Sequence, residues 1–132
     1  MIQELKTVVC VEDEAEMIEL VKLILNAKQG FEVHGALGGQ VGLEKIAEIQ
    51  PDLVLLDLMM PEIDGWQVYQ SMRVDPVMNS IPVIIVTAKA QSIDKVLGLH
   101  IAKVDDYLTK PFSPQQLLAS VHKVLGRTAA ES

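Results

Sequence analysis

A single carboxylate, Asp57, stands where a buried strand is expected to end. The letters LVLL at positions 53–56 are all apolar and run directly into this acid. A short apolar run without a polar break is typical of a strand that is buried on both faces, as in a parallel sheet. Ligand sites in open α/β sheets lie beyond the carboxyl ends of the strands. The pattern therefore predicts a carboxylate at a sheet edge, although an Asp that merely opens the turn at 60–65 would explain the same letters.

Other reactive side chains follow further predicted strands. Glu12 and Asp13 come after the first strand. Thr87 ends the fourth strand, and Lys110 follows the fifth. Because the carboxyl ends of parallel strands share one edge, we expect these residues to converge on Asp57. Crowded carboxylates repel one another, and Mg²⁺ relieves that repulsion. An ammonium and a hydroxyl can bind an oxyanion, and a carboxylate can be a nucleophile, so the combination indicates phosphoryl transfer to an aspartate.

Each of these residues also has a plainer explanation. Residues 12–14 (EDE) could be capping acids before the first helix, because carboxylates are favourable at a helix N-terminus. Thr87 could simply end a β-branched strand, and Lys110 could be a solvated loop charge. The coincidence of all of them at one edge favours the functional interpretation.

Strands and helices alternate along the chain. We expect strands at 6–11, 31–34, 53–57, 81–87 and 106–109, and helices at 15–28, 41–49, 65–73, 92–102 and 114–125. Such alternation predicts right-handed crossovers, and hence a doubly wound parallel sheet with helices on both faces. Gly35 is interpreted as part of a loop, and Gly126 as the end of the last helix. Residues 1–126 would form the domain, and residues 127–132 a tail or the start of a linker.

Composition narrows the function classes. The 132 residues suffice for one domain, and 18 acidic against 11 basic residues give a net charge of −7. Phosphate contacts need clusters of Lys and Arg, so direct nucleic-acid binding by this domain is not expected. No apolar run approaches about 18 residues, so no membrane segment is expected either. Cys10 is interpreted as a core residue, and a single cysteine fits the reducing cytoplasm, where we expect the protein to act.

Four motifs give the sequence a family resemblance. They are VEDE at 11–14, LLDLMMPEIDGW at 55–66, VTA at 86–88 and DDYLTKPF at 105–112. With them the chain resembles the receiver domains of two-component response regulators over about residues 7–125. The resemblance implies a flavodoxin-like fold, in which five parallel strands in the order 2-1-3-4-5 are flanked by five helices.

The resemblance also implies roles for the residues at the strand ends. Asp57 would accept a phosphoryl group from the phosphohistidine of a sensor histidine kinase or a phosphotransfer protein. Asp13 and Asp57 would bind Mg²⁺ directly, together with the backbone carbonyl of Met59. Glu12, which stands where the family often has Asp, would act on the metal through a water molecule.

The remaining implied roles concern the switch. Lys110 would pair with Asp57 and then with the phosphoryl group, across a cis Lys110–Pro111 bond. Thr87 would move to bind the phosphoryl oxygen, and Tyr107 would turn inward. The surface of the fourth helix, fifth strand and fifth helix would report the change and allows a homodimer. However, Gln116 and Ser120 stand where dimerising members carry an acid and an arginine.

The expected activity is limited to the domain's own phosphorylation and slow dephosphorylation, so the chain is not expected to be an enzyme acting on external substrates. The alternative is a receiver-shaped interaction module that does not accept phosphate. A hydrolase with an aspartyl-phosphate intermediate is a third hypothesis. Such enzymes commonly carry a second carboxylate two residues after the nucleophile, where this chain has Met59.

Overall fold

The computed structural model describes residues 5–27, 30–88 and 104–131. Strands and helices alternate through residue 88, as the sequence predicts, and one further strand and helix lie within residues 104–131. The strands are β1 (Lys6–Glu12), β2 (Phe31–Leu37), β3 (Leu53–Asp57), β4 (Val83–Thr87) and β5 (Asp106–Thr109). The helices are α1 (Ala15–Asn26), α2 (Gly39–Ile49), α3 (Gly65–Val74) and α5 (Pro114–Glu131). The fourth expected helix, at 92–102, lies outside the described residues.

The five strands form one parallel sheet in the order β2-β1-β3-β4-β5, which confirms the predicted topology. The register aligns the strand ends. Asp57 is level with Val86 on β4, and Thr87 is level with Thr109 on β5. Glu12, Asp57, Thr87 and Lys110 therefore belong to one carboxyl edge, as the sequence pattern predicts.

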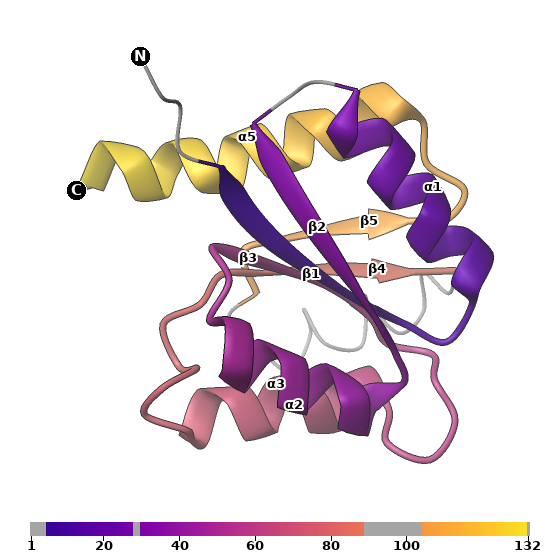
Figure 1. Ribbon diagram of the computed structural model, residues 1–132, viewed down its shortest axis with the longest axis vertical. Coiled ribbons are helices and arrows are strands. Elements are labelled where there is room, and N and C mark those ends of the chain that lie inside the picture. The colour runs from indigo at the N-terminus through magenta and orange to yellow at the C-terminus, as the bar shows by residue number, and fades with distance from the viewer. Residues whose placement is uncertain (1–4, 28–29, 89–103, 132) are drawn as a thin grey trace.

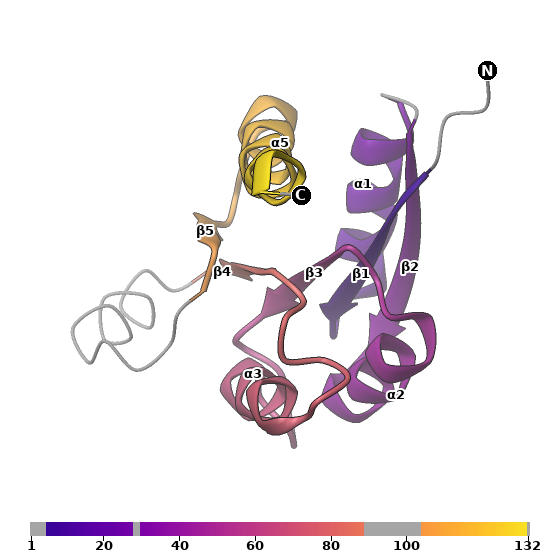
Figure 2. The same ribbon diagram turned by 90° about the vertical axis from the view of Figure 1, so that its left-hand side faces the viewer.

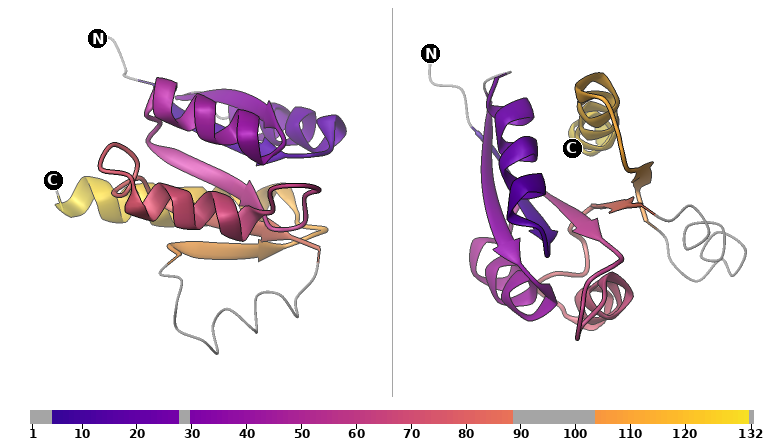
Figure 3. Two further views of the ribbon diagram at one scale, coloured as in Figure 1. Left: turned by 90° about the horizontal axis from the view of Figure 1, so that it is seen from below. Right: turned by 90° about the vertical axis from the view of Figure 1, so that its right-hand side faces the viewer.

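Helices cover both faces of the sheet. Helices α1 and α5 lie on one face, and α2 and α3 lie on the other (Figures 1 and 2). Viewed from below, α2 and α3 run side by side across their face (Figure 3, left). Each face has its own apolar core, since successive strand residues point to opposite sides. Cys10 lies in the core beneath α1 and α5, as predicted, and burial raises the pKa of its thiol to about 12.

Helix α3, which follows the loop after Asp57, begins with a capping box. The Asp64 carboxylate accepts a hydrogen bond from the Gln67 backbone at 3.0 Å, and the Gln67 side chain accepts one from the Asp64 backbone at 2.9 Å. The last helix begins in the same way: Ser113 Oγ accepts from the backbone N–H of Gln116 at 3.1 Å, and the Gln116 side chain accepts from the Ser113 backbone at 2.8 Å. Such caps satisfy backbone donors that a helix cannot pair internally. Both helices thus start at defined residues next to the site.

Three strands differ from their predicted bounds. Strand β1 ends at Glu12, one residue later than predicted. Strand β2 continues to Leu37, so the interpretation of Gly35 as a loop residue is wrong. Gly35 lies inside the strand, level with Cys10 of β1, and it is a glycine because a Cβ there would overlap the side chain of Ile18 on α1. Strand β4 begins at Val83 rather than at Ile81. Pro82 has no N–H for the ladder, and the N–H of Ile81 bonds instead to the carbonyl of Met78 at 3.2 Å.

Helix ends also differ from the predictions. The last helix does not end at Gly126 but continues to Glu131, because a glycine weakens a helix without necessarily breaking it. Helix α2 begins at Gly39, two residues before the predicted start, and α3 ends one residue later than predicted, at Val74. Helix α1 ends at Asn26, before the predicted Lys28, which is not among the described residues. No helix in the described part of the chain has the length and apolar character needed to cross a bilayer.

Candidate functional site

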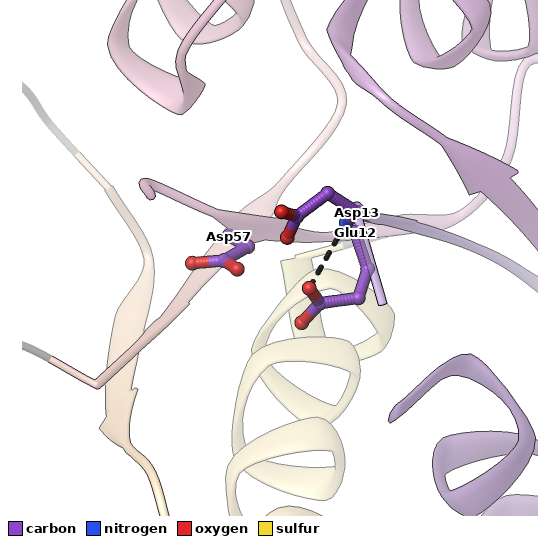
Figure 4. Close-up of side chains that lie close together, drawn as sticks. All are labelled: Glu12, Asp13 and Asp57. Carbon is purple, nitrogen blue, oxygen red and sulfur yellow. Dashed lines mark hydrogen bonds between the residues drawn. The ribbon is translucent and has the colours of Figure 1, made fainter. Parts of the chain in front are cut away.

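Three carboxylates meet between the ends of β1 and β3. Glu12 and Asp57 are buried, with 2% and 3% of their surface exposed, and Asp13 is exposed. One carboxylate oxygen from each acid can be chosen so that all three lie within 4.8 Å of one another (Figure 4). The predicted convergence of these acids is therefore confirmed.

Lys110 supplies the positive charge of this cluster. Its Nζ lies 2.5 Å from Glu12 Oε1 and 3.2 Å from Asp57 Oδ2. The Lys110 side chain is 11% exposed, and its backbone N–H donates to the carbonyl of Thr87 at 2.9 Å. The Lys110–Pro111 peptide bond is cis, as the family resemblance implies. The predicted contact of Lys110 with Asp57 is present, and the shorter contact with Glu12 was not predicted.

Backbone groups also hold the Asp57 carboxylate. The backbone N–H of Met59 donates to Asp57 Oδ1 at 3.0 Å, while Lys110 occupies Oδ2. Behind Asp57, the loop closes through a hydrogen bond from the Gly65 N–H to the Leu58 carbonyl at 3.1 Å. A Cβ at position 65 would overlap the backbone carbonyl of Asp57, so glycine is required there for space. Sequence reasoning did not assign a role to Gly65 or to the Met59 N–H.

Burial and neighbouring charges shift the pKa values of Glu12 and Lys110. Burial raises the pKa of the Glu12 carboxyl from 4.5 to about 7, with the neighbouring Asp57 adding to the rise and the Lys110 hydrogen bond opposing it. Burial alone would lower the pKa of Lys110, but its hydrogen bonds and proximity to Glu12 and Asp57 outweigh this, so the pKa lies above the ordinary 10.5. The amine therefore stays charged beside Asp57 at neutral pH.

The two predicted switch residues occupy different environments. Thr87 is fully buried at the end of β4, one position beyond the level of Asp57. Tyr107 on β5 is 43% exposed. The Met59 side chain is also exposed, and the role of its carbonyl as a metal ligand stays a prediction.

The residues present fit a divalent cation. Oxygen-only donors from two or three carboxylates suit Mg²⁺, which keeps several waters and accepts phosphate oxygens as further ligands. An exposed acid, Asp13, gives such an ion access from solvent. Together, the parallel sheet and this edge define an α/β domain with an acidic, lysine-bearing site at its strand ends.

Comparison with known proteins agrees with this class. The chain matches the family model of the response regulator receiver domain over residues 8–122. It belongs to that family, whose members are regulatory domains rather than metabolic enzymes.

Two curated relatives show how far the similarity extends. The alkaline phosphatase synthesis transcriptional regulatory protein PhoP of Bacillus subtilis is 38% identical over 123 residues, which is 93% of this chain and 50% of PhoP. The DNA-binding dual master transcriptional regulator RpaA of Synechocystis is 39% identical over 121 residues, which is 92% of this chain and 49% of RpaA. The chain thus spans about half the length of these relatives.

Solved structures lead to the same family. The receiver domain of the Francisella response regulator 1452 is 30% identical and superposes with a TM-score of 0.80. The match covers 93% of this chain and 98% of that domain. The flavodoxin-like order of strands predicted from the motifs therefore agrees with both the topology and the comparison.

Proposed function

We propose that Asp57 accepts a phosphoryl group from the phosphohistidine of a sensor histidine kinase or a phosphotransfer protein. The observation that carries the proposal is the position of the Asp57 carboxylate beside the amine of Lys110. Asp57 ends a rigid buried strand, and the charged amine of Lys110 lies 3.2 Å from its Oδ2. A carboxylate held beside a cation suits nucleophilic attack on phosphorus, because the positive charge offsets the negative charges of the carboxylate and of the phosphoryl oxygens.

The transfer is a simple exchange of bonds. A carboxylate oxygen of Asp57 attacks phosphorus and forms the P–O bond, while the P–N bond to the donor histidine breaks and its electron pair leaves with the imidazole. The Met59 N–H holds Oδ1 and fixes the plane of the carboxylate. Lys110 is positioned to bind a phosphoryl oxygen, and hydrolysis of the acyl phosphate by water would end the signal slowly.

Mg²⁺ is the proposed cofactor. Asp13, Asp57 and the backbone carbonyl of Met59 would bind it directly, and Glu12 would reach it through a water molecule. The mutual proximity of the carboxylate oxygens, within 4.8 Å, supports this assignment. When bound, the ion supplies charge neutralisation for the phosphoryl oxygens and for the crowded acids.

Thr87 and Tyr107 are the proposed switch. The phosphoryl group adds charge next to the end of β4, where a hydroxyl can bind a phosphoryl oxygen. Movement of Thr87 would leave space that Tyr107, now half exposed on β5, fills by turning inward. The affected surface would comprise the expected helix 92–102, β5 and α5, through which the domain would signal to its target in the cytoplasm.

The same surface is the proposed site of a homodimer. In this structure, the acid on β5 already has partners within the chain. Asp106 Oδ2 accepts from Ser120 Oγ at 2.6 Å, and Asp106 Oδ1 lies 3.7 Å from Lys123 Nζ. A dimer would have to share or replace these contacts. Light scattering with and without beryllofluoride, which mimics the phosphoryl group, tests whether the mass doubles.

Phosphotransfer profiling tests the proposed donor. Purified histidine kinases, labelled on histidine with radioactive ATP, are incubated briefly with the wild-type chain and with Asp57→Asn. We expect at least one kinase to lose its label rapidly to the wild type and not to the variant. Transfer to neither protein, under conditions in which the same kinases label another receiver, would favour the alternative of an interaction module without phosphorylation.

A further inference from the structure

We propose that Glu12 is a positioning residue that holds the ammonium group of Lys110 over Asp57. This inference rests on the proposed function, because it explains how the cation needed at the phosphoacceptor is kept in place. It assigns Glu12 a contact with the lysine as its main role, beyond a water-mediated contact with the metal.

The two oxygens of the Glu12 carboxylate face different donors. Oε2 accepts from the backbone N–H groups of Asp13 at 3.0 Å and Glu14 at 3.2 Å, so the side chain folds back on its own turn. Oε1 points the other way and accepts from Lys110 Nζ at 2.5 Å. At 2% exposure, Glu12 has almost no contact with solvent. The Glu12 carboxylate is therefore held at both of its oxygens.

The position of Lys110 shows why a tether is needed. Lys110 follows β5, at the edge of the sheet, whereas Glu12 ends β1, and β4 and β3 lie between these two strands. The lysine side chain must extend across the strand ends to reach Asp57. Its contact with Glu12 is shorter than its contact with Asp57, at 2.5 Å against 3.2 Å. Glu12 therefore anchors the amine on the far side of the phosphoacceptor.

The chemistry of this arrangement requires a carboxylate of this length. Both carboxylate oxygens of Glu12 accept from hydrogen-bond donors, so the amide of a glutamine would have to turn its NH₂ group toward one of these donors. An aspartate would keep the charge but lacks one methylene, so it could not contact both the turn and the lysine as they are placed. Glutamate meets both requirements.

The test observes the Lys110 ammonium directly in the metal-free protein. A lysine ammonium held by hydrogen bonds exchanges its protons slowly and gives a ¹⁵N-correlated NMR signal, which Lys110→Arg identifies by its loss. We expect the signal in the wild type. Glu12→Gln should speed its exchange on the order of tenfold or more, since a charge-assisted hydrogen bond is lost. Asp13→Asn is the matched control, because it removes one negative charge from the same cluster and should leave the signal in place.

Further variants keep the test decisive. Glu12→Asp retains the charge and should also lose the slow exchange, and it replaces Glu12→Gln if that variant does not give a folded amide spectrum. In calorimetry, Asp13→Asn should weaken Mg²⁺ binding more than Glu12→Gln does. An unchanged Lys110 signal in both Glu12 variants, or an equal loss in Asp13→Asn, would overturn the inference. Because these measurements involve no phosphoryl donor, their outcome is separate from the test of Asp57 as the acceptor.

Discussion

The backbone nitrogen of Gly65 lies 3.1 Å from the carbonyl oxygen of Leu58, and this hydrogen bond closes the β3–α3 loop directly behind Asp57. The loop can approach the strand end so closely because residue 65 has no side chain. The loop backbone thus packs against the backbone of Asp57, while the Met59 N–H and the Lys110 amine hold its carboxylate.

Gly65→Ala should destabilise the protein by about 1–3 kcal/mol, the usual cost of forcing a methyl group into packed structure. The added Cβ would overlap the Asp57 carbonyl, so the loop would have to move. The control is Gly126→Ala on α5, where a Cβ meets nothing within 4 Å and where alanine should be neutral or stabilising. Urea unfolding measures both. Equal stability of the two variants would contradict the close packing of residue 65 against the Asp57 carbonyl.

Arg73 ties the end of α3 to the loop before β4. Its guanidinium donates to the carbonyls of Asn79 at 2.8 Å and Ile81 at 3.1 Å, and it lies 4.6 Å from the ring centre of Tyr69. Arg73→Ala should lower the free energy of unfolding by about 1–3 kcal/mol, because it leaves these acceptors unpaired and removes the ring contact. Lys123→Ala, at a side chain that is 59% exposed, should cost less than about 1 kcal/mol. If thermal unfolding showed that Lys123→Ala destabilises the protein more than Arg73→Ala does, the assigned role of Arg73 would be contradicted.

Lys110→Ala should destabilise the metal-free protein by about 3 kcal/mol, because it leaves two buried carboxylates without their cation. Millimolar Mg²⁺ should recover part of this loss, since the ion supplies positive charge to the same acids. Calorimetric melting with Mg²⁺ and with a chelator gives the comparison. Lys22→Ala, at an exposed pair with Glu19, should show no such rescue. A Lys110→Ala protein that is as stable as the wild type without metal would contradict the pairing.

Much of the site could be predicted from the sequence because strand ends are easy to recognise. An apolar run that stops at an acid, as at Asp57, fixes both the strand and the edge where it ends. Parallel pairing then brings Glu12, Thr87 and Lys110 to that edge without further assumptions. The order of the strands came from the motifs, since periodicity alone does not specify which strands are neighbours.

What the sequence did not predict depends on contacts between distant segments. Gly35 is of a residue type common in loops, yet it lies in β2, where the close packing of Ile18 from α1 leaves no room for a side chain. The partnership of Glu12 with Lys110 joins residues 98 positions apart, and no local pattern indicates it. The continuation of α5 through Gly126 shows separately that a single glycine does not mark the end of this helix.

Acetyl phosphate tests the central claim most directly, because this small donor needs no partner protein. The chain is incubated with acetyl phosphate and Mg²⁺, and intact mass spectrometry follows the gain of one phosphoryl group. Borohydride reduction and peptide mapping then locate the acyl phosphate. We expect Mg²⁺-dependent labelling at Asp57 that Asp57→Asn and chelation both abolish. Labelling of the Asp57→Asn variant at the wild-type level, or none in the wild type, would contradict the assignment of Asp57 as the phosphoacceptor.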